Sequence, residues 1–461
     1  MADWSALELS ASVAEQLPDW SGAVAHLHDR PGPRTVDILR AADRAGVPAI
    51  QPRCGVGGHR EMITLLQELE KSHPAVLSVT IDSYTRLRQF DTAASLLAED
   101  AGRLNGYPLV AHGWRRGREL ADAVSVPLEI RHGSPDGREL FATALAAGIT
   151  SFEGGGIGYN LPYCKDVPLD ESLRTWRQID ATCGALAKDG VIVDRELFGT
   201  LTAVLMPPSL CIAITLLEAI AAAKEGVRCI SIAYPQGGEI YQDVAALRAI
   251  RTLAQRYVGS GVEVFPVLHQ FMGVFPTDPA WASGLILHGS LTARLGGAAK
   301  VVNKTEHEAH GVPDAVTNGR GIRTTAVGVS QLFDFVQLSE ERVEQELSWI
   351  EEEVRELIKP VLAEPDLLAG ICAAFSTGRL DLPFSASVHA HSRVVPRRDA
   401  GGAIRYADPG LLSLSSATRR RHGQLLSTRA TSAPDRPEAD ELSIAIQDIF
   451  YFANREPAHR P

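Results

Sequence analysis

Short apolar runs alternate with amphipathic stretches along most of the first 310 residues. Nine of these runs are typical of buried parallel strands: 47–53, 75–82, 107–113, 126–133, 149–155, 201–206, 227–234, 262–270 and 299–305. The intervening stretches, such as 61–73 and 243–258, carry apolar residues at helical spacing. Regular alternation of this kind predicts an α/β fold with a parallel sheet, and its length fits a (β/α)8 TIM barrel.

A barrel of this type needs eight strands, so one of the nine runs, either 108–112 or 201–206, must be misread or lie outside the barrel. Polar residues recur just past the ends of the runs: Arg53, Arg86, His112, Arg131, Glu153, His269 and Lys304. In barrel proteins the carboxyl ends of the strands and the loops that follow them form the active site. We therefore expect these side chains to converge on one mouth, whereas a doubly wound sheet would bring together only two or three.

The chain divides into three predicted parts. A short N-terminal arm covers 1–32, a barrel catalytic domain covers 33–365, and an irregular C-terminal extension that packs on the barrel covers 366–461. A long acidic amphipathic helix is expected over 340–362, and a last apolar helix over 441–453 is expected to pack the tail back on the body.

Composition excludes several classes of protein. The 461 residues are 45% hydrophobic with a net charge of −11, and an acidic chain is a poor partner for nucleic acid. Six scattered cysteines without a Cys-x-x-Cys pair predict free thiols in a reducing compartment. The first 20 residues have no basic and apolar leader pattern, and no run is long enough to span a membrane. We expect a cytoplasmic protein.

Three arginines, Arg53, Arg86 and Arg131, each lie near a predicted strand end. Taken singly, each could be an ordinary surface or ion-pairing arginine. If all three face one cavity, their charges repel, and burying an unpaired charge costs several kcal/mol. A ligand with more than one carboxylate would offset that cost through bidentate hydrogen bonds. The three arginines therefore favour an anionic substrate.

The segment 151–166 carries a second candidate cluster. Glu153 is followed by three glycines, which permit close approach of the backbone to a ligand, and Tyr159 and Tyr163 follow in the loop. The glycines do not open a helix in a GxGxxG pattern, so dinucleotide binding is disfavoured. The tyrosines could simply pack the loop. Alternatively, a carboxylate beside phenols suits an ammonium group, which Glu153 could hold or deprotonate as a catalytic base.

The segment 304–311 holds Lys304 and Glu308, four residues apart and therefore on one face of a helix. An ordinary ion pair would explain them equally well. His307 and His310 lack the HExxH spacing and further ligands, so we predict no metal site. The chain also lacks a GxSxG elbow and a Walker loop.

Eight blocks occur in one order along the chain: QPRCGVGGH, TIDSYTR, LNGYPLVAHG, RHGSPD, SFEGGGIGYNLPYCKD, MPPSL, HQFMGVFP and KTEHEAHG. Together they resemble the large (epsilon) subunit of the glutamate mutase, or methylaspartate mutase, family. The resemblance implies a (β/α)8 barrel that binds glutamate, uses adenosylcobalamin, and isomerises L-glutamate to 3-methylaspartate by radical rearrangement of the carbon skeleton.

The resemblance also implies roles for individual residues. It makes Arg53, Arg86 and Arg131 a clamp on the two substrate carboxylates, with Glu153 nearest the amino group. The further substrate contacts that it implies are His132, Glu153, Tyr159 and Tyr163. The cofactor contacts that it implies are Gly55, Asn105, Pro162, Phe275, Lys304, Glu308 and Val312, of which Lys304 and Glu308 would hold the adenosyl ribose.

No histidine of this chain stands in a D-x-H-x-x-G motif, which carries the lower cobalt ligand in cobalamin enzymes of this type. The resemblance therefore implies a separate small cobalamin-binding subunit, in a heterotetramer built on a homodimer of large subunits. The segments 195–208 and 231–243, at the predicted ends of strands six and seven, depart from the usual family pattern. Two alternatives remain open: a cobalamin-free lyase or aldolase acting on a dicarboxylate through Lys304, and a non-catalytic subunit that retains the fold.

Overall fold

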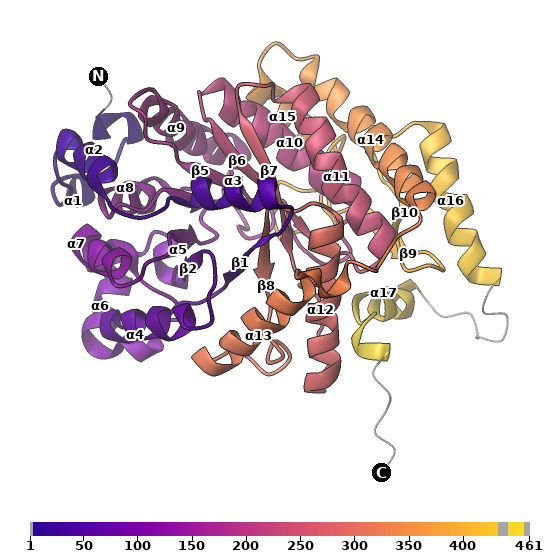
Figure 1. Ribbon diagram of the computed structural model, residues 1–461. Helices are drawn as coiled ribbons and strands as arrows, with labels where there is room; N and C mark the ends of the chain where they lie inside the picture. The colour runs from indigo at the N-terminus through magenta and orange to yellow at the C-terminus, as the bar shows by residue number, and fades with distance from the viewer. Residues whose placement is uncertain (1–2, 432–440, 456–461) are drawn as a thin grey trace.

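A nearly closed barrel of eight parallel strands forms the centre of the molecule in the computed structural model, which describes residues 3–431 and 441–455 (Figure 1). The strands are β1 (Ala49–Pro52), β2 (Leu77–Thr80), β3 (Leu128–Arg131), β4 (Ser151–Glu153), β5 (Asp194–Leu197), β6 (Cys229–Pro235), β7 (Glu263–His269) and β8 (Lys300–Asn303). Neighbouring strands pair in the order β1-β8-β7-β6-β5-β4-β3-β2. At the remaining seam, Thr80 N donates to Cys54 O over 2.8 Å. The predicted (β/α)8 barrel is confirmed.

Helices surround the barrel and separate its strands in sequence. Those between and after the strands are α4 (His59–Glu70), α5 (Ser83–Arg86), α6 (Phe90–Asp100), η2 (Ala101–Arg103), α7 (Leu109–Asp122), α8 (Arg138–Ala146), α9 (Leu169–Lys188), α10 (Pro208–Lys224), α11 (Ile240–Tyr257), α12 (Pro279–Leu295) and α13 (Ala315–Gly328). Residues next in sequence fix where some of these helices begin. The side chain of Asp278 caps the first turn of α12, whose first residue is Pro279, and the side chain of Asp314 caps α13.

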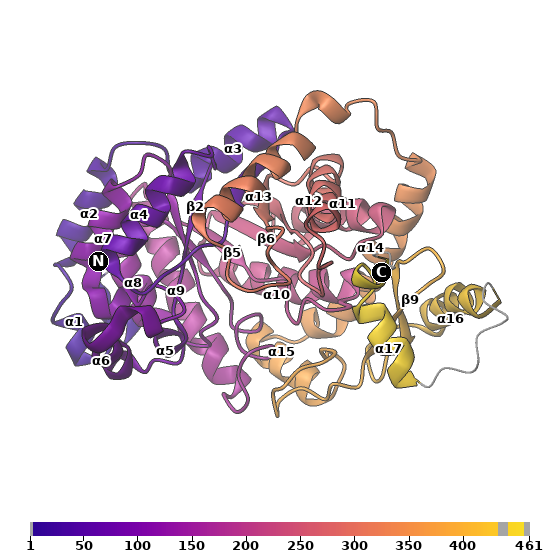
Figure 2. The ribbon, with the colours of Figure 1, turned by 90° about the horizontal axis from the view of Figure 1, so that it is seen from below.

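The N-terminal part is helical: its first helices lie at one side of the barrel, and its last helix runs across the middle of the view in Figure 1 (Figures 1 and 2). It contains η1 (Trp4–Leu7), α1 (Ala11–Ala14), α2 (Trp20–Asp29) and α3 (Thr35–Ala45). Arg30 ties this part to the barrel, because its guanidinium donates to the carbonyls of Gly148 and Ala121, each over 2.7 Å.

Both doubtful strand predictions are wrong. The run 107–113 leads into α7, and His112, expected at a strand end, lies in that helix, where its Nε2 donates to Gly57 O over 2.9 Å. The run 201–206 is a loop in which Leu201, Ala203 and Leu205 have positive φ angles. Apolar character was the signal for these runs, and it reflects burial in a helix and a loop instead.

One strand escaped prediction. Strand β5 contains Asp194, Arg195 and Glu196, and all three are fully buried. A strand made mostly of charged residues has no apolar run, so the hydrophobic pattern did not predict it. The segments 195–208 and 231–243, which are expected to depart from the family pattern, begin in strands five and six, one earlier than predicted.

The chain continues after α13 with helices and a small ribbon at the opposite side from the N-terminus (Figure 1). These elements are η3 (Gln331–Phe333), α14 (Glu340–Leu362), α15 (Leu367–Ser376), the antiparallel pair β9 (Val395–Arg398) and β10 (Ile404–Asp408), α16 (Ser416–Thr431), α17 (Glu441–Ile449) and η4 (Ala453–Arg455). The expected helix 340–362 is present, with Pro360 inside its last turn.

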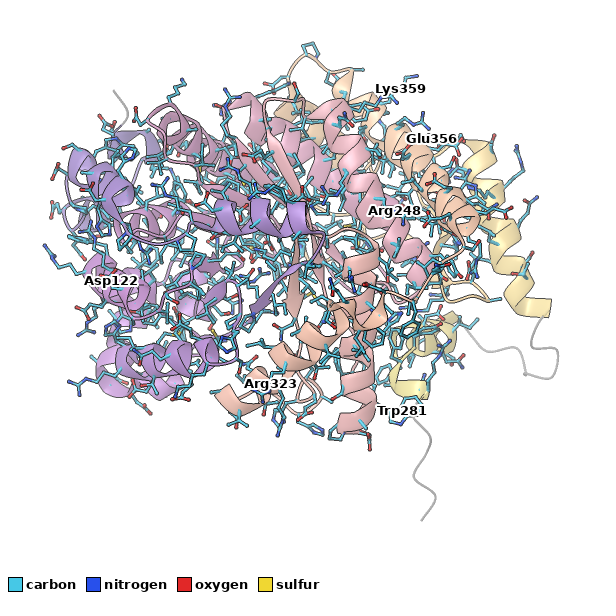
Figure 3. The ribbon with its side chains drawn as sticks, in the orientation of Figure 1. Asp122, Arg248, Trp281, Arg323, Glu356 and Lys359 are labelled. Atoms are coloured by element: carbon cyan, nitrogen blue, oxygen red, sulfur yellow. The ribbon has the colours of Figure 1, made fainter. Side chains whose placement is uncertain are left out.

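Helix α14 is fastened to the barrel and to the ribbon by ion pairs. Arg248 of α11, labelled in Figure 3, pairs with Glu340 over 2.6 Å. On the other side, the guanidinium of Arg405 in β10 forms a forked pair with Glu346. None of the described helices combines the length and apolar character needed to cross a bilayer. All six cysteines are free thiols, as predicted.

Candidate active site at the barrel mouth

Tyr163 lies close to all three arginines that the sequence predicted for the site. It follows β4, and its ring is 46% exposed at the mouth. Desolvation by the surrounding protein atoms raises the pKa of its hydroxyl. The charges of Arg53, Arg86 and Arg131 all act to lower this pKa. A methyl group on Gly133 would lie 3.6 Å from Arg86 Cδ and 4.0 Å from Tyr163 Cγ. The three arginines therefore lie around Tyr163, although Arg53 follows β1, Arg86 ends α5 and Arg131 ends β3.

The arginines differ in their partners. Arg131 is 3% exposed and pairs with three carboxylates. Within residues 3–431 and 441–455, by contrast, neither Arg53 nor Arg86 forms an ion pair. Arg53 is exposed, and the buried Nε of Arg86 has no hydrogen-bond partner among the described residues. The expectation of three unpaired guanidiniums thus needs correction: two are free to meet an anion, and the charge of the third is offset inside the barrel.

Arg131 sits at the top of a buried ion network. Its Nη1 donates to Glu129 over 2.7 Å and to Glu196 over 3.1 Å, and its Nη2 donates to Glu153. Deeper in the barrel, Lys300 pairs with both Glu129 and Glu196. Burial alone would raise the pKa of Glu196, but Lys300 and Arg131 outweigh burial and hold it well below its usual value. This network gives Arg131 a fixed orientation.

Glu153 is the carboxylate nearest the mouth, and it is 1% exposed. One oxygen accepts from Arg131, and the other accepts from the hydroxyl of Tyr159. Burial raises the pKa of Glu153 to about 8, helped by the negative charges of Glu196 and Glu129 and opposed by Arg131. A carboxyl with a pKa near neutrality can hold an ammonium group or exchange a proton with it.

His132 lies in a cluster of aromatic rings that includes Tyr159, the partner of Glu153. Its ring stacks on Trp176 with centroids 5.7 Å apart and meets Tyr159 edge-on at 4.7 Å. Its Nδ1 accepts from Ser134 N over 3.1 Å, and its buried Nε2 has no partner among the described residues. Burial, aided by nearby arginines, lowers its pKa well below the usual value. Burial thus outweighs the hydrogen bond to the backbone of Glu153, which acts to raise the pKa of His132.

Sequence reasoning missed part of this site. Glu129, Glu196 and Lys300 were not proposed, and His269 was noted only as a strand-end residue. All four are at most 2% exposed. The available signal was a charged residue inside an otherwise apolar strand, as in VPLEIR and AKVVN, because such a residue can be buried only with a partner.

A cluster with metal-ligand chemistry also lies here. Carboxylate oxygens of Glu153 and Glu196 and a ring nitrogen of His269 come within 4.8 Å of one another. Arg131 contacts all three, including His269 Nε2 at 3.2 Å. Its guanidinium therefore supplies the positive charge that a metal ion would bring. Within the described part of the chain, no metal-ligand group includes His307 or His310.

The residues expected at the cofactor mostly line the open rim. Lys304 Nζ pairs with Glu308 over 2.6 Å in a turn after β8, not in the helix that the spacing favoured. Burial lowers the pKa of Lys304, and Glu308 counteracts this effect. Asn105 is exposed and accepts from Ser83 N over 2.9 Å, and Val312 is 85% exposed.

Three further cofactor candidates lie at different depths. Gly55 packs so closely on β2 that a Cβ would lie 2.4 Å from Thr80 O, and Pro162 is half-buried beside Tyr163. Phe275 is only 3% exposed, in an apolar cluster with Phe271. Gly55 and Pro162 thus border the mouth, and Phe275 supports the loop after β7 from within.

The fold and the mouth together define a (β/α)8-barrel protein whose carboxyl-end face combines free guanidiniums with a buried glutamate. The particular family follows from sequence comparison. A model described as the methylaspartate mutase E chain matches residues 33–457, and the chain belongs to this family.

Three curated relatives match over more than nine tenths of their length, and each is named glutamate mutase epsilon subunit. The Halobacterium salinarum protein is 40% identical over 442 residues, covering 94% of this chain and 91% of the relative. The Yersinia enterocolitica protein is 38% identical over 442 residues, covering 93% and 91%. The Desulfitobacterium hafniense protein is 37% identical over 455 residues, covering 96% and 93%.

Proposed function

We propose that this chain is the substrate-binding barrel of an adenosylcobalamin-dependent glutamate mutase, which interconverts L-glutamate and 3-methylaspartate. The observation that carries this proposal is the grouping of two unpaired guanidiniums, Arg53 and Arg86, with the buried carboxyl of Glu153 around Tyr163. It occurs in a chain whose relatives are named glutamate mutase epsilon subunit.

The charges of the mouth are complementary to L-glutamate. The substrate carries two carboxylates and one ammonium group. Arg53 and Arg86 can each form a forked hydrogen-bond pair with a carboxylate, and Arg131 adds a third positive charge from below. We assign Glu153, whose carboxyl is buried and accepts from Tyr159, as the acceptor of the ammonium group. Tyr159, Tyr163 and His132 complete the walls, so that the bound molecule has one orientation.

The rim fits a large cofactor laid over the mouth. Asn105 and Val312 are exposed there, and the paired Lys304 and Glu308 present a donor and an acceptor suited to ribose hydroxyls. When bound, adenosylcobalamin supplies the cobalt–carbon bond whose cleavage starts the radical rearrangement. The task of the chain is to fix the substrate charges and to keep water from the reacting carbon atoms.

A second subunit completes the proposed enzyme. The relatives' name denotes one subunit of several, and this chain has no D-x-H-x-x-G motif. We assign most of the corrin contacts to a small cobalamin-binding subunit that carries this motif. The proposed assembly is a cytoplasmic heterotetramer, with two copies of this chain.

The test combines the purified chain with a small D-x-H-x-x-G subunit encoded beside it, adenosylcobalamin and L-glutamate under anaerobic conditions. We expect 3-methylaspartate in the NMR spectrum and a substrate-dependent electron paramagnetic resonance signal. Mixtures lacking either subunit or the cofactor serve as controls. A complete mixture that neither binds L-glutamate nor forms product contradicts the proposal.

A further inference from the structure

Four buried charges close a ring inside the barrel below the mouth. Arg131 and Glu129 come from β3, Glu196 from β5, and Lys300 from β8. The contacts run from Arg131 Nη1 to Glu129 and Glu196, and from each of these carboxylates to Lys300 Nζ. Every member is at most 3% exposed. The ring is therefore shielded from water, and each charge depends on the other three.

Lys300 and Arg131 have different surroundings within this ring. Arg131 reaches upward with Nη2 to Glu153, while Lys300 lies on the far side of Glu129 and Glu196. Burial acts to lower the pKa of Lys300, but the surrounding carboxylates, including Asp194, raise it above its usual value. Lys300 thus remains charged and competes with Arg131 for the same two carboxylates.

We propose that Lys300 is a positioning residue for substrate binding. By holding Glu129 and Glu196 at depth, it lets these two carboxylates contact only Nη1 of Arg131, so that Nη2 faces Glu153 and His269. This inference rests on the proposed function, because Glu153 is there the acceptor of the substrate ammonium group. Without Lys300, Glu196 would pair with both nitrogens of Arg131, and the guanidinium would leave Glu153.

Three variants separate positioning from stability. Lys300→Met keeps the length of the side chain but leaves two carboxylates sharing one cation, which weakens both folding and binding. Lys300→Met combined with Glu129→Gln restores the charge balance, so stability should recover. Glu129→Gln alone keeps Lys300 on Glu196 and is the matched control.

Binding is measured by calorimetric titration of L-glutamate into the chain assembled with the small subunit and hydroxocobalamin. The stability of each variant is measured separately by urea unfolding. The titration stoichiometry reports the folded fraction, and the dissociation constant reports positioning. We expect a dissociation constant at least about tenfold higher than wild type in the double variant despite recovered stability. For Glu129→Gln alone, we expect binding weaker than wild type but a clearly smaller loss than in the double variant, because Lys300 still holds Glu196.

Two results would overturn the inference without touching the proposed function. One is a double variant that regains the wild-type dissociation constant together with its stability. The other is Glu129→Gln alone weakening binding as much as the double variant, since Lys300 would then add nothing. If the wild-type complex itself fails to bind L-glutamate, the proposed function is contradicted, and this inference falls with it.

Discussion

The three arginines of the barrel mouth are distinguished by what surrounds each guanidinium. Arg131 is committed to carboxylates of the barrel, whereas Arg53 and Arg86 have no ion pair among the described residues. A guanidinium left without a carboxylate gains most when an anionic ligand arrives. The two unpaired arginines should therefore contribute more to substrate affinity than to folding.

Replacing Arg86 with lysine tests this expectation. Lysine keeps the positive charge but cannot form a forked pair with a carboxylate, so the dissociation constant for L-glutamate should rise about 10- to 100-fold. The midpoint of thermal unfolding should change little. Titration calorimetry gives the affinity, and Arg103→Lys on the exposed η2 segment is the control. An unchanged dissociation constant would remove Arg86 from the binding site.

Substrate affinity should depend on pH through Glu153. Because its pKa is raised to about 8 in the free protein, its carboxyl holds a proton at pH 7. An ammonium group requires the ionised form, so binding releases that proton, and affinity increases as pH rises toward 8. Below that point, we expect the apparent dissociation constant to fall about tenfold per pH unit.

Titration calorimetry at pH 7 in two buffers of different ionisation heat measures the release, which should be close to one proton. The Glu153→Gln variant should lose most of the pH dependence. Proton uptake on binding, or an affinity that is constant between pH 6.5 and 8, would show that Glu153 is not the group that titrates.

Among the secondary-structure elements, β5 shows why sequence pattern was insufficient. Asp194 and Glu196 face the polar interior of the barrel, where they meet Ser231 and Lys300. Arg195 faces outward and pairs with Asp180 of α9 over 2.8 Å. A strand that is polar on both faces can be buried only when hydrogen-bond or ion-pair partners lie on both sides of it. Those partners come from other strands and helices, so no local pattern reveals them.

The glycines after β4 were expected to allow close approach of the backbone to a ligand, and in the structure Gly154 lies against two aromatic rings of the protein. Gly154 has φ 128°, and a Cβ there would lie 2.4 Å from the Trp176 ring and 2.6 Å from that of Tyr159. Gly154→Ala should therefore destabilise the protein by about 2 kcal/mol or more in urea unfolding and displace Tyr159 from Glu153.

Gly284→Ala is the matched control for that substitution. Gly284 lies inside α12 and has open space around its Cα, so alanine there should be neutral or stabilising by up to about 1 kcal/mol. If both alanine variants are equally stable, the contacts described around Gly154 do not constrain the loop.

For the whole molecule, the segment that contains Phe452 lies at the carboxyl-end face of the barrel. Phe452 packs edge-on against Phe271, which follows β7, with ring centroids 4.9 Å apart. It also lies against Gly238, where a Cβ would come within 2.6 Å of its ring. Trp281, at the start of α12, marks the same end of the molecule in Figure 3. We propose that the extension 366–461 supports the loops after β6 and β7.

Removal of the Phe452 ring should loosen these loops. Phe452→Ala loses part of an apolar contact, which should lower the free energy of unfolding by about 1–2 kcal/mol. Hydrogen exchange should increase in 270–276 and remain unchanged in β1 to β5. Phe335, which is 75% exposed, provides the control substitution Phe335→Ala. Equal exchange in the two variants would mean that the extension does not support the loop.

The sequence by itself determined the alternation of strands and helices, the glycine loop, and the positions of the arginines near strand ends. These features follow from hydrophobic periodicity and local backbone preferences, which act over a few residues. Tertiary structure decided which arginine is paired and which is free. Lys300 meets Glu129 across 171 positions of sequence. Only closure of the barrel brings such charges within contact, and their energies depend on that contact and on the exclusion of water around it.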